Sequence, residues 1–439
     1  MGGEWPLVNL GDLIEVTTGF PFKSSQYSTN NKGFKLLRGD NVVQGTFRWE
    51  NVKLWPKTEL TDKHNAYWLQ ENDVILAMDR PWIEAGLKTS QIKKYDIPCL
   101  LVQRVASLRA TEGLDQNYLR YVISSYWFVE YVKSVQTGTA VPHISPTQIK
   151  SFEFKLPSTQ EQKAIAHILG SLDDKIEINR RMNTTLEAMA QALFKSWFVD
   201  FDPVIDKALA AGNPIPESFH KRAEARKALG KRRKPLPADI AQHFPDRFVF
   251  NEEMGWVPDG WEVETIGKVL ELAYGKSLPA KKRIDGDIPV YGSGGISGSH
   301  NEKLVEGPGI IVGRKGTVGS LYWVEHAYFP IDTVFYVIRK LDLPLYWIYQ
   351  SLQLIDIKSL GADSAVPGVN RNAIYAKFFT IPKDDIFKGY LNIIEKNIAK
   401  QKNIDLENGI LIQLRDTLLP KLLSGQLRIP NAENFFKDA

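Results

Sequence analysis

Two kinds of hydrophobic pattern occur along the chain, and each of them occurs twice. In residues 1–157, and again in 255–382, short runs of β-branched and aromatic residues are separated by turns that contain glycine or proline, which predicts short β-strands. Residues 117–134 and 343–359 have helical patterns within these regions. The sequence therefore predicts two compact, β-rich α+β domains of roughly 120–150 residues each.

A heptad seam follows the first of these domains. Apolar residues and two asparagines recur in alternating steps of four and three, which is the spacing of a coiled-coil helix. Ser158 and Glu161, just before the seam, have the spacing of a capping box. A helix over about 159–201 would be roughly 65 Å long at about 1.5 Å per residue. The seam consists of Ile165, Leu169, Leu172, Ile176, Asn179, Asn183, Leu186, Ala190, Leu193 and Trp197.

A second seam follows the second domain, over about 385–424, and ends at Ser424-Gly425. A helix of this length cannot bury its seam against its own domain alone, so we predict that the two helices pack antiparallel, with seam asparagines fixing the register at some cost in stability. The residues expected to pack in this way are Leu172, Ile176, Asn183, Leu186, Leu193, Trp197, Phe198, Asn408, Leu411, Leu418 and Leu422.

The first seam ends in four aromatic rings, at Phe194, Trp197, Phe198 and Phe201. These rings carry more apolar surface than one seam can cover. We predict that they pack in a core at the end of the helix pair, with contact to a partner subunit as the alternative.

The chain is an internal repeat. Residues 5–19 align with 261–275 without a gap, so that Trp5 meets Trp261 and Gly19 meets Gly275. Residues 71–80 resemble 306–315, and 140–157 match 365–382. The predicted fold is therefore α+β: two tandem β-rich globular domains separated by a pair of long antiparallel helices, with a pseudo-twofold repeat. Its expected segments are 1–157 (first domain), 158–202 (first helix), 203–254 (basic linker or insertion), 255–382 (second domain) and 383–427 (second helix).

Composition and charge narrow the class of protein. The chain is 43% hydrophobic and 24% charged, as in ordinary globular proteins, and no apolar run is long enough to span a membrane. The N-terminus lacks the pattern of a signal peptide, and the single cysteine, Cys99, fits a reducing compartment. These features predict a cytoplasmic protein that does not bind membranes.

Positive charge is concentrated in one segment. Residues 204–250 hold ten Lys/Arg against five Asp/Glu, while the whole chain has a net charge of +4. The run Lys231–Lys234 suits a polyanionic partner. The alternative is a solvated linker.

No catalytic motif stands out. Residues 274–277 have the end of a P-loop, but Leu270 replaces its first glycine. The methyltransferase tetrapeptide of Asp/Asn, two prolines and an aromatic residue is missing, and seven scattered histidines with one cysteine give no zinc spacing. A nucleophilic site formed by residues distant in sequence stays open at this point.

Glycine-rich loops with the chemistry of DNA contact occur at matching places in both domains. Glycine lets backbone N–H groups approach phosphates, and Arg or Lys can neutralise phosphates or read guanine. Each loop taken alone has the composition of an ordinary turn, but the matching sets favour a shared DNA-binding surface. We expect Arg38, Asn41 and Arg80 to read bases and Lys23 and Ser24 to contact phosphates. The further candidates are Trp82, Thr139, His143, Lys276, Tyr291, Ser293, Arg314, Lys315, Thr317, Ser364 and Asn370.

Residues 158–204, 243–267 and 414–427 give the chain a specific family resemblance. With the repeat, they resemble the specificity subunit of type I restriction–modification systems. The resemblance implies that each half carries a target-recognition domain for one part of a bipartite, asymmetric DNA site, and that the helices act as a spacer. It also implies a non-catalytic chain. The segment 203–254 departs from compact members of the family.

The resemblance further implies partners and their cofactors. Double-stranded DNA and two modification (methyltransferase) subunits that bind S-adenosylmethionine are expected, together with restriction subunits that use ATP and Mg. No cofactor or metal is expected in this chain. Two alternatives remain from the residues themselves: a stand-alone DNA methyltransferase or nuclease with an unrecognised site, and a coiled-coil scaffold without a DNA role.

Overall fold

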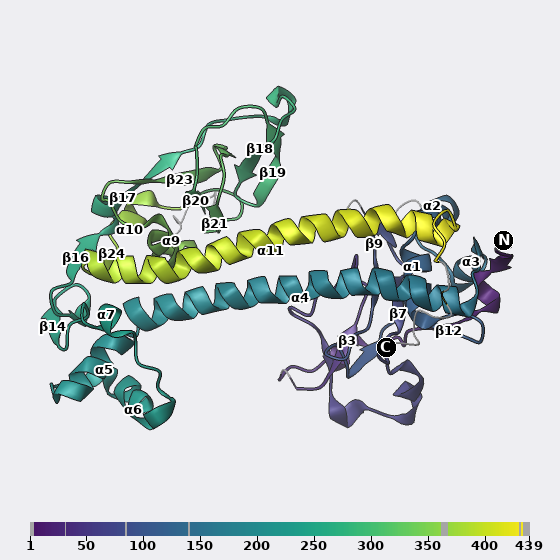
Figure 1. Cartoon of the computed structure of the whole chain (residues 1–439), viewed down its shortest axis with the longest axis horizontal. Coiled ribbons are helices and arrows are strands. Elements are labelled where there is room, and N and C mark those ends of the chain that lie inside the picture. Colours follow the sequence, from purple (N-terminus) through teal and green to yellow (C-terminus); the bar gives the residue numbers. More distant parts are fainter. Residues whose placement is uncertain are drawn as a thin grey trace. The chain divides into compact units, whose positions relative to one another are not determined.

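The computed structural model describes residues 4–30, 32–83, 86–138, 141–360, 368–429 and 432. The chain divides into two compact units: unit 1 is Met1–Arg181 with Ile404–Ala439, and unit 2 is Met182–Asn403. Both boundaries fall inside long helices, α4 (Thr159–Phe198) and α11 (Asp384–Ser424) (Figure 1). Each unit therefore contains a globular part and a segment of both helices.

The globular part of unit 1 is built on two small sheets. One is antiparallel, in the order β10 (Thr89–Gln91), β7 (Val74–Ala77), β12 (Val105–Ala110), β2 (Ile14–Thr18). In the other, β3 (Phe34–Leu37) lies between the parallel strand β11 (Cys99–Leu101) and the antiparallel strand β6 (Leu54–Trp55). The remaining pairs are β1 (Leu7–Asn9) with β13 (Glu153–Lys155), β4 (Val42–Val43) with β5 (Thr46–Phe47), and β8 (Trp82–Ile83) with β9 (Gly86–Leu87).

Unit 2 repeats this topology. Its antiparallel sheet has the order β17 (Leu270–Tyr274), β23 (Val334–Arg339), β20 (Gly309–Gly313), β21 (Leu321–Val324). In its second sheet, β18 (Ile288–Gly292) lies between β19 (Gly295–His300) and the parallel strand β22 (Phe329–Pro330), and β16 (Glu262–Thr265) pairs with β24 (Phe378–Ile381). The strand orders correspond one to one, and the predicted internal repeat is confirmed.

Short helices complete both globular parts. The helical pattern at 117–134 forms two helices rather than one, because Ser125 has an extended backbone and its side chain accepts a hydrogen bond from the N–H of Phe128, as an N-cap does. The helices of unit 1 are α1 (Gln116–Ser124), α2 (Tyr126–Val135) and α3 (Pro146–Lys150). Those of unit 2 include α8 (Ile266–Val269), α9 (Leu345–Gln353) and α10 (Arg371–Tyr375).

Within unit 1, α4 and α11 lie side by side and antiparallel. Asn179 is 1% exposed, and its Nδ2 donates to Oδ1 of Asn408 at 3.1 Å and to Oε2 of Glu407 at 2.8 Å. Toward the start of α4, Asp173 accepts a hydrogen bond from Arg415 on α11 at 3.0 Å. From Asn179 to Asp173 the residue number on α4 falls, while on α11 the partner's number rises from Asn408 to Arg415. The helices therefore run antiparallel, and the predicted pairing is confirmed.

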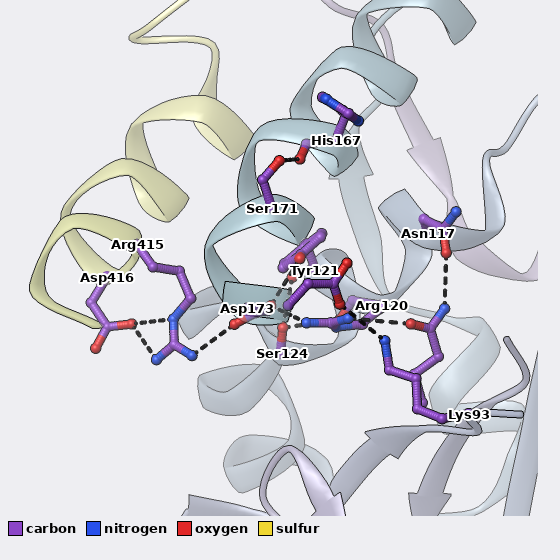
Figure 2. Close-up of polar contacts among 12 residues, drawn as sticks. Lys93, Asn117, Arg120, Tyr121, Ser124, His167, Ser171, Asp173, Arg415 and Asp416 are labelled. Atoms are coloured by element: carbon purple, nitrogen blue, oxygen red, sulfur yellow. Dashed lines mark hydrogen bonds and ion pairs between the residues drawn. The ribbon is translucent and has the colours of Figure 1, made fainter. Parts of the chain in front are cut away.

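A polar network attaches the globular part of unit 1 to these helices (Figure 2). Asp173 on α4 accepts hydrogen bonds from Arg120 and from the Tyr121 hydroxyl (2.9 Å), both on α1, and from Arg415 on α11. Burial raises the pKa of Tyr121, so its hydroxyl remains a donor. One carboxylate therefore joins three helices of the unit.

Within unit 2, the aromatic end of α4 packs in a core. Trp197 is 1% exposed, and its ring centroid lies 6.1 Å from that of Tyr390 on α11. Phe198 lies 5.0 Å from Tyr390 and 6.2 Å from Phe387. Core packing of the aromatic end is therefore confirmed. All the residues expected to pack along the two helices, in both units, are buried or partly buried.

The capping box expected at the start of α4 is only half formed. The N–H of Glu161 donates to Oγ of Ser158 at 3.3 Å. The Glu161 carboxylate does not turn back to the cap, because it accepts hydrogen bonds from Arg428 at 2.6 and 2.9 Å and from the indole of Trp5 at 3.2 Å. Glu161 thus links the N-terminal strand region to the segment after α11.

Residues 203–254 are folded, and the reading of this segment as a linker is corrected. The first long helix ends at Phe198, and Phe201 has a left-handed backbone (φ 50°) that turns the chain into the next helix. Val204, Ala223 and Phe244 are buried in the unit 2 core. The segment contains α5 (Asp202–Ala211), α6 (His220–Ala228), α7 (Ala238–Ala241), β14 (Phe248–Asn251) and β15 (Gly255–Pro258).

Ion pairs explain much of the local basic charge. Arg222 bonds both carboxylate oxygens of Asp202, at 2.7 and 2.6 Å, and Arg226 and Arg233 bond Asp206. These pairs fasten α6 and the segment after it to α5. Part of the positive charge that was expected to bind a polyanion is therefore neutralised by carboxylates within the same segment.

Candidate nucleic-acid interface

Four of the predicted DNA-contact residues of unit 1 lie around one open cavity of about 700 Å³. Lys23 and Ser24 follow β2, Arg38 follows β3, and Arg80 follows β7. These strands belong to the two sheets of the unit, and loops at their ends converge on the cavity. The fold thus brings together Lys23 and Arg80, which are more than fifty residues apart in the sequence. The cavity is also lined by Asp40, Asp79, Lys88 and Arg104.

The cavity is electropositive. Five Lys/Arg residues line it against two Asp. One of these, Asp79, is bonded to Arg104 at 2.6 Å and to Nδ1 of His143 at 2.7 Å. Burial alone would raise the pKa of Asp79, but the hydrogen bonds from His143 and Arg104 bring it below its ordinary value. Asp79 is thus a neutralised anion that leaves an excess of positive charge for an anionic ligand.

Lys88 is partly buried at the cavity. Burial lowers the pKa of Lys88, the charges of Asp40 and Asp79 raise it, and the charge of Arg80 lowers it; the net shift is downward, with burial as its largest cause. The excess of five Lys/Arg over two Asp, rather than this shift, is what suits a polyanion.

Arg80 has the geometry of a functional position. Its φ of 45° lies in the left-handed region, which a non-glycine residue adopts at a cost. The backbone is held there because the Arg80 N–H donates to the carbonyl of Pro142 at 2.6 Å. Its side chain is exposed at the cavity.

Three other predicted residues of unit 1 have structural roles. Asn41 is 8% exposed: its Oδ1 accepts the N–H of Arg38 and its Nδ2 donates to the carbonyl of Arg48. Its amide is used inside the loop, so its expected role as a base reader is corrected. Trp82 is partly buried against the unit 1 core with Lys133 over its ring at 4.0 Å, and His143 bonds Asp79. Thr139 lies outside the described residues.

In unit 2 the two predicted glycine-rich loops meet. Oγ of Ser293 accepts the N–H of Thr317 at 3.3 Å, and the Ser293 carbonyl accepts the Tyr322 hydroxyl at 3.0 Å. A Cβ on Gly316, whose φ is 78°, would lie 2.9 Å from Oγ of Ser293, so the close approach requires glycine. The structure thus brings Ser293 and Thr317 together.

Arg314 is held firmly at the end of β20. Its N–H donates to the carbonyl of Thr333 at 3.0 Å, and its Nη1 donates to the carbonyl of Asp332 at 3.0 Å. Among the described residues, no carboxylate pairs with its guanidinium. Most of its N–H donors therefore remain available for a ligand. Lys315 and Thr317, on the same loop, are exposed, as is Lys276.

Two predicted residues of unit 2 also have structural contacts. Asn370 is the N-cap of α10, where its Oδ1 accepts the N–H groups of Asn372 and Ala373 at 3.1 and 3.2 Å. Its side chain is exposed, and its role in DNA contact stays a prediction. The Tyr291 ring lies tilted against that of Tyr322 and edge to face with that of Tyr328, and burial raises the pKa of Tyr291. Ser364 lies outside the described residues.

The two sites are equivalent in the repeat. Arg80 follows β7 and Arg314 follows β20, and each of these strands lies next to an edge strand of the larger sheet, β10 or β21. Beside each, an isolated bridge joins this segment to the one after the helical region: Asp79 with His143, and Lys315 with Gly368. The sequence missed Lys88 and Arg104 in unit 1, and Tyr274 and Arg371 in unit 2. Tyr274 is next to Gly275, which the alignment of the repeats had identified. The arginines that contact the Tyr274 ring, Arg314 and Arg371, are distant from it in sequence.

Other chemistry is limited among the described residues. No group of His, Cys, Asp and Glu in this part of the chain could hold a metal ion. Burial raises the pKa of the Cys99 thiol to about 12, so it is not a thiolate near neutral pH. No helix in the part of the chain that the structure describes is both long and apolar enough to cross a bilayer.

Comparison with known proteins places the chain in a family. The family model for the type I restriction modification DNA specificity domain matches residues 2–188 and 258–415. The chain belongs to this family. Both matched ranges contain one globular part and part of a long helix, so the family covers both halves of the repeat.

Individual relatives agree with this assignment. The specificity subunit of the type I restriction enzyme MjaVIII of Methanocaldococcus jannaschii is 33% identical over 185 residues, which are 42% of this chain and 43% of that protein. The chain thus spans less than half of that relative. The specificity subunit of HindI of Haemophilus influenzae is 28% identical over 363 residues, covering 71% of this chain and 77% of that protein.

A solved structure shows the same fold. The S subunit of a type I restriction–modification system from M. genitalium matches with a TM-score of 0.51 at 16% identity, over 95% of this chain and 96% of that one. The α+β architecture with two β-rich domains and long helices is therefore that of the family.

Proposed function

We propose that this chain is the DNA sequence-specificity subunit of a type I restriction–modification complex. The observation that carries the proposal is the repeated site: in two topologically equivalent units, an arginine follows the equivalent strand, β7 or β20, and lies beside other cations. Support also comes from the family. Each unit would press these loops into the major groove and read base edges by side-chain hydrogen bonds.

The two units would read different half-sites. In unit 1 the arginine shares a cavity with Lys23, Lys88, Asp79 and Arg104, whereas in unit 2 it lies over the rings of Tyr274 and Phe335. Different donors at equivalent positions select different bases. The proposed target is therefore bipartite and asymmetric.

The helix pair would set the distance between the half-sites. Both α4 and α11 pass from one unit into the other, and a helix pair with a packed seam resists bending. Helix length would then translate into base-pair spacing, at about 3.4 Å per base pair.

Catalysis would come from partners. Two modification subunits that bind S-adenosylmethionine would dock on the two equivalent surfaces, and restriction subunits that use ATP and Mg would join them in the cytoplasm. This chain would supply recognition and contribute no cofactor. A stand-alone methyltransferase or nuclease is the alternative.

One experiment tests these readings. The purified chain, with and without the modification subunit, is assayed for binding to duplex DNA in gel shifts and for adenine methylation. We expect sequence-specific binding and methylation only in the combined sample. Methylation or cleavage by the chain alone would establish the enzyme alternative, and absence of DNA affinity in both samples would indicate a scaffold.

A further inference from the structure

Unit 2 contains an aromatic and cationic cluster beside Arg314. Tyr274 ends β17, and its side chain is 51% exposed. The Cζ atom of Arg314 lies 4.8 Å from the Tyr274 ring centroid, and that of Arg371 lies 5.2 Å from the same centroid. One half-exposed ring is thus contacted by two guanidinium groups.

The cluster is rigid. Tyr274 lies across from Phe335 on β23, with the two rings edge to face at 5.0 Å. Arg371 is held in turn, because its Nη1 donates to the carbonyl of Leu272 at 3.3 Å and its Cζ lies 5.6 Å from the Tyr375 ring. The three side chains therefore start from β17, β20 and α10 but are fixed by neighbouring backbone and rings.

The cluster also carries excess positive charge. Each guanidinium has one hydrogen bond to a backbone carbonyl, and neither is paired with a carboxylate in the part of the chain that the structure describes. An arginine offers five N–H donors. Two unneutralised guanidiniums at a surface loop are the chemistry that binds guanine edges and phosphates.

Holding an arginine in place changes what it can do. A free arginine loses rotamer entropy when it is immobilised, and it reaches phosphates in many directions. An arginine fixed over a ring by a cation–π contact has lost part of that freedom before DNA arrives. A fixed direction favours the bidentate bond to O6 and N7 of guanine over a bond to any nearby phosphate.

We propose that Tyr274, Arg314 and Arg371 form the specificity-determining cluster of the second half-site. Tyr274 is a positioning residue that aims the Arg314 guanidinium at a guanine edge, and Arg371 binds an adjacent backbone phosphate. This inference rests on the proposed function and assigns it to named side chains. The residue that aligns with Tyr274 in the first repeat is Thr18, since Gly19 aligns with Gly275, so the device belongs to one half-site only.

The test uses the full chain assembled with its modification subunits. Methylation mapping first gives the bipartite site of the wild-type complex. Affinities and initial methylation rates are then measured on the cognate duplex and on duplexes with single base-pair changes in either half. We expect Tyr274→Leu to reduce discrimination in the second half-site by roughly tenfold, with discrimination in the first half-site unchanged. Tyr274→Phe, which keeps the ring, is expected to behave as wild type.

Two further variants separate the roles. Arg371→Gln is expected to weaken binding to all duplexes by a similar factor and to reduce the salt dependence by about one phosphate contact. Tyr95→Leu is the matched control: Tyr95 is 53% exposed in unit 1, with the Cζ of Arg181 at 4.4 Å from its ring, and we expect it to leave both half-sites unchanged.

The outcomes are distinct. If Tyr274→Leu keeps full discrimination, or weakens all duplexes equally with a lower melting temperature, the ring is structural and the inference is wrong. If the wild-type complex shows no base preference in either half, the proposed function itself fails. If Tyr274→Phe loses discrimination as Tyr274→Leu does, the ring is not what positions Arg314.

Discussion

At the residue scale, a polar side chain can contact DNA only if its hydrogen-bonding groups are not already used by contacts within the protein. Asn41 and Arg80 both come from loops of DNA-binding composition. Both Oδ1 and Nδ2 of Asn41 are hydrogen-bonded within its own loop. Arg80 is held by its backbone N–H, and its guanidinium lies at the cavity. Only the second can discriminate between ligands.

Arg80 gives a first prediction. We expect Arg80→Gln to lower discrimination in the first half-site by about 1–3 kcal/mol, because a bidentate contact to guanine is worth that amount, and to leave the second half-site unchanged. Methylation rates on duplexes altered in either half measure it. Arg48→Gln, an exposed arginine outside the cavity, is the control. Equal loss at both half-sites would assign Arg80 to backbone contact.

Asp202 gives a prediction on pH. Burial alone would raise the pKa of this carboxyl, but hydrogen bonds from Arg222 and Ser196 and the charge of Arg226 bring it below its ordinary value of 3.8. A carboxyl with a lowered pKa in the folded state stabilises the fold above its unfolded pKa, and this contribution is lost as pH falls through the folded pKa.

We therefore expect Asp202→Asn to melt at a lower temperature than wild type near neutral pH, and the gap to close below about pH 4. Circular dichroism melts across a pH series measure it. Glu252→Gln, at an exposed position, is the control and should show no gap. A gap that persists unchanged at low pH would mean that Asp202 acts through packing alone.

At the element scale, the helix pair combines an apolar seam with a buried polar contact. Asn179 and Asn408 bond each other inside the seam of unit 1, while unit 2 fills the corresponding space with aromatic rings. Apolar packing is not sensitive to a shift of one heptad, but an asparagine pair is satisfied in only one alignment. The polar pair thus fixes the register that the apolar residues stabilise.

A double-mutant cycle tests this division. We expect Asn179→Leu alone and Asn408→Leu alone each to cost about 1–3 kcal/mol of unfolding free energy, because each leaves the other amide buried without this partner. Asn179→Leu combined with Asn408→Leu should restore or exceed wild-type stability. Denaturant unfolding gives the four free energies. Additive effects of the two substitutions would show that the pair is not coupled.

At the scale of the whole molecule, the helices are the connection through which both units are linked. An insertion of one heptad into both α4 and α11 adds about 10 Å of helix and preserves the seam. We expect it to lengthen the unspecified spacer of the DNA site by about three base pairs without changing either half-site, as measured by methylation mapping.

An insertion into α4 alone is the control, and it should abolish sequence-specific methylation because the two seams no longer match. Altered half-sites with an unchanged spacer in the double insertion would overturn the proposed role of the helices.

Sequence patterns alone were enough to place the repeated β-rich domains, the bounds of α4 and α11 to within a few residues, and the pairing of these helices. The reason is that strand and helix periodicities are local properties of the sequence. A seam that includes Ile176, Leu186 and Trp197 also has no other surface to pack against than the second helix. The alignment of residues 71–80 with 306–315 also placed Arg80 opposite Lys315, the neighbour of Arg314, because turn chemistry after a buried strand is visible in the chain.

Which polar groups remain available for DNA depends on the folded arrangement of the chain. Hydrogen-bond partners come from distant segments: Asp202 finds Arg222, which turns an expected linker into packed helices, and Asn370 is used by a helix end. Tyr274 and Arg371 meet although most of unit 2's globular part separates them in sequence. A hydrophobic pattern shows which face of a helix or strand is buried. A hydrogen bond instead requires one particular atom at about 3 Å, and atoms distant in sequence reach that distance only when the chain folds.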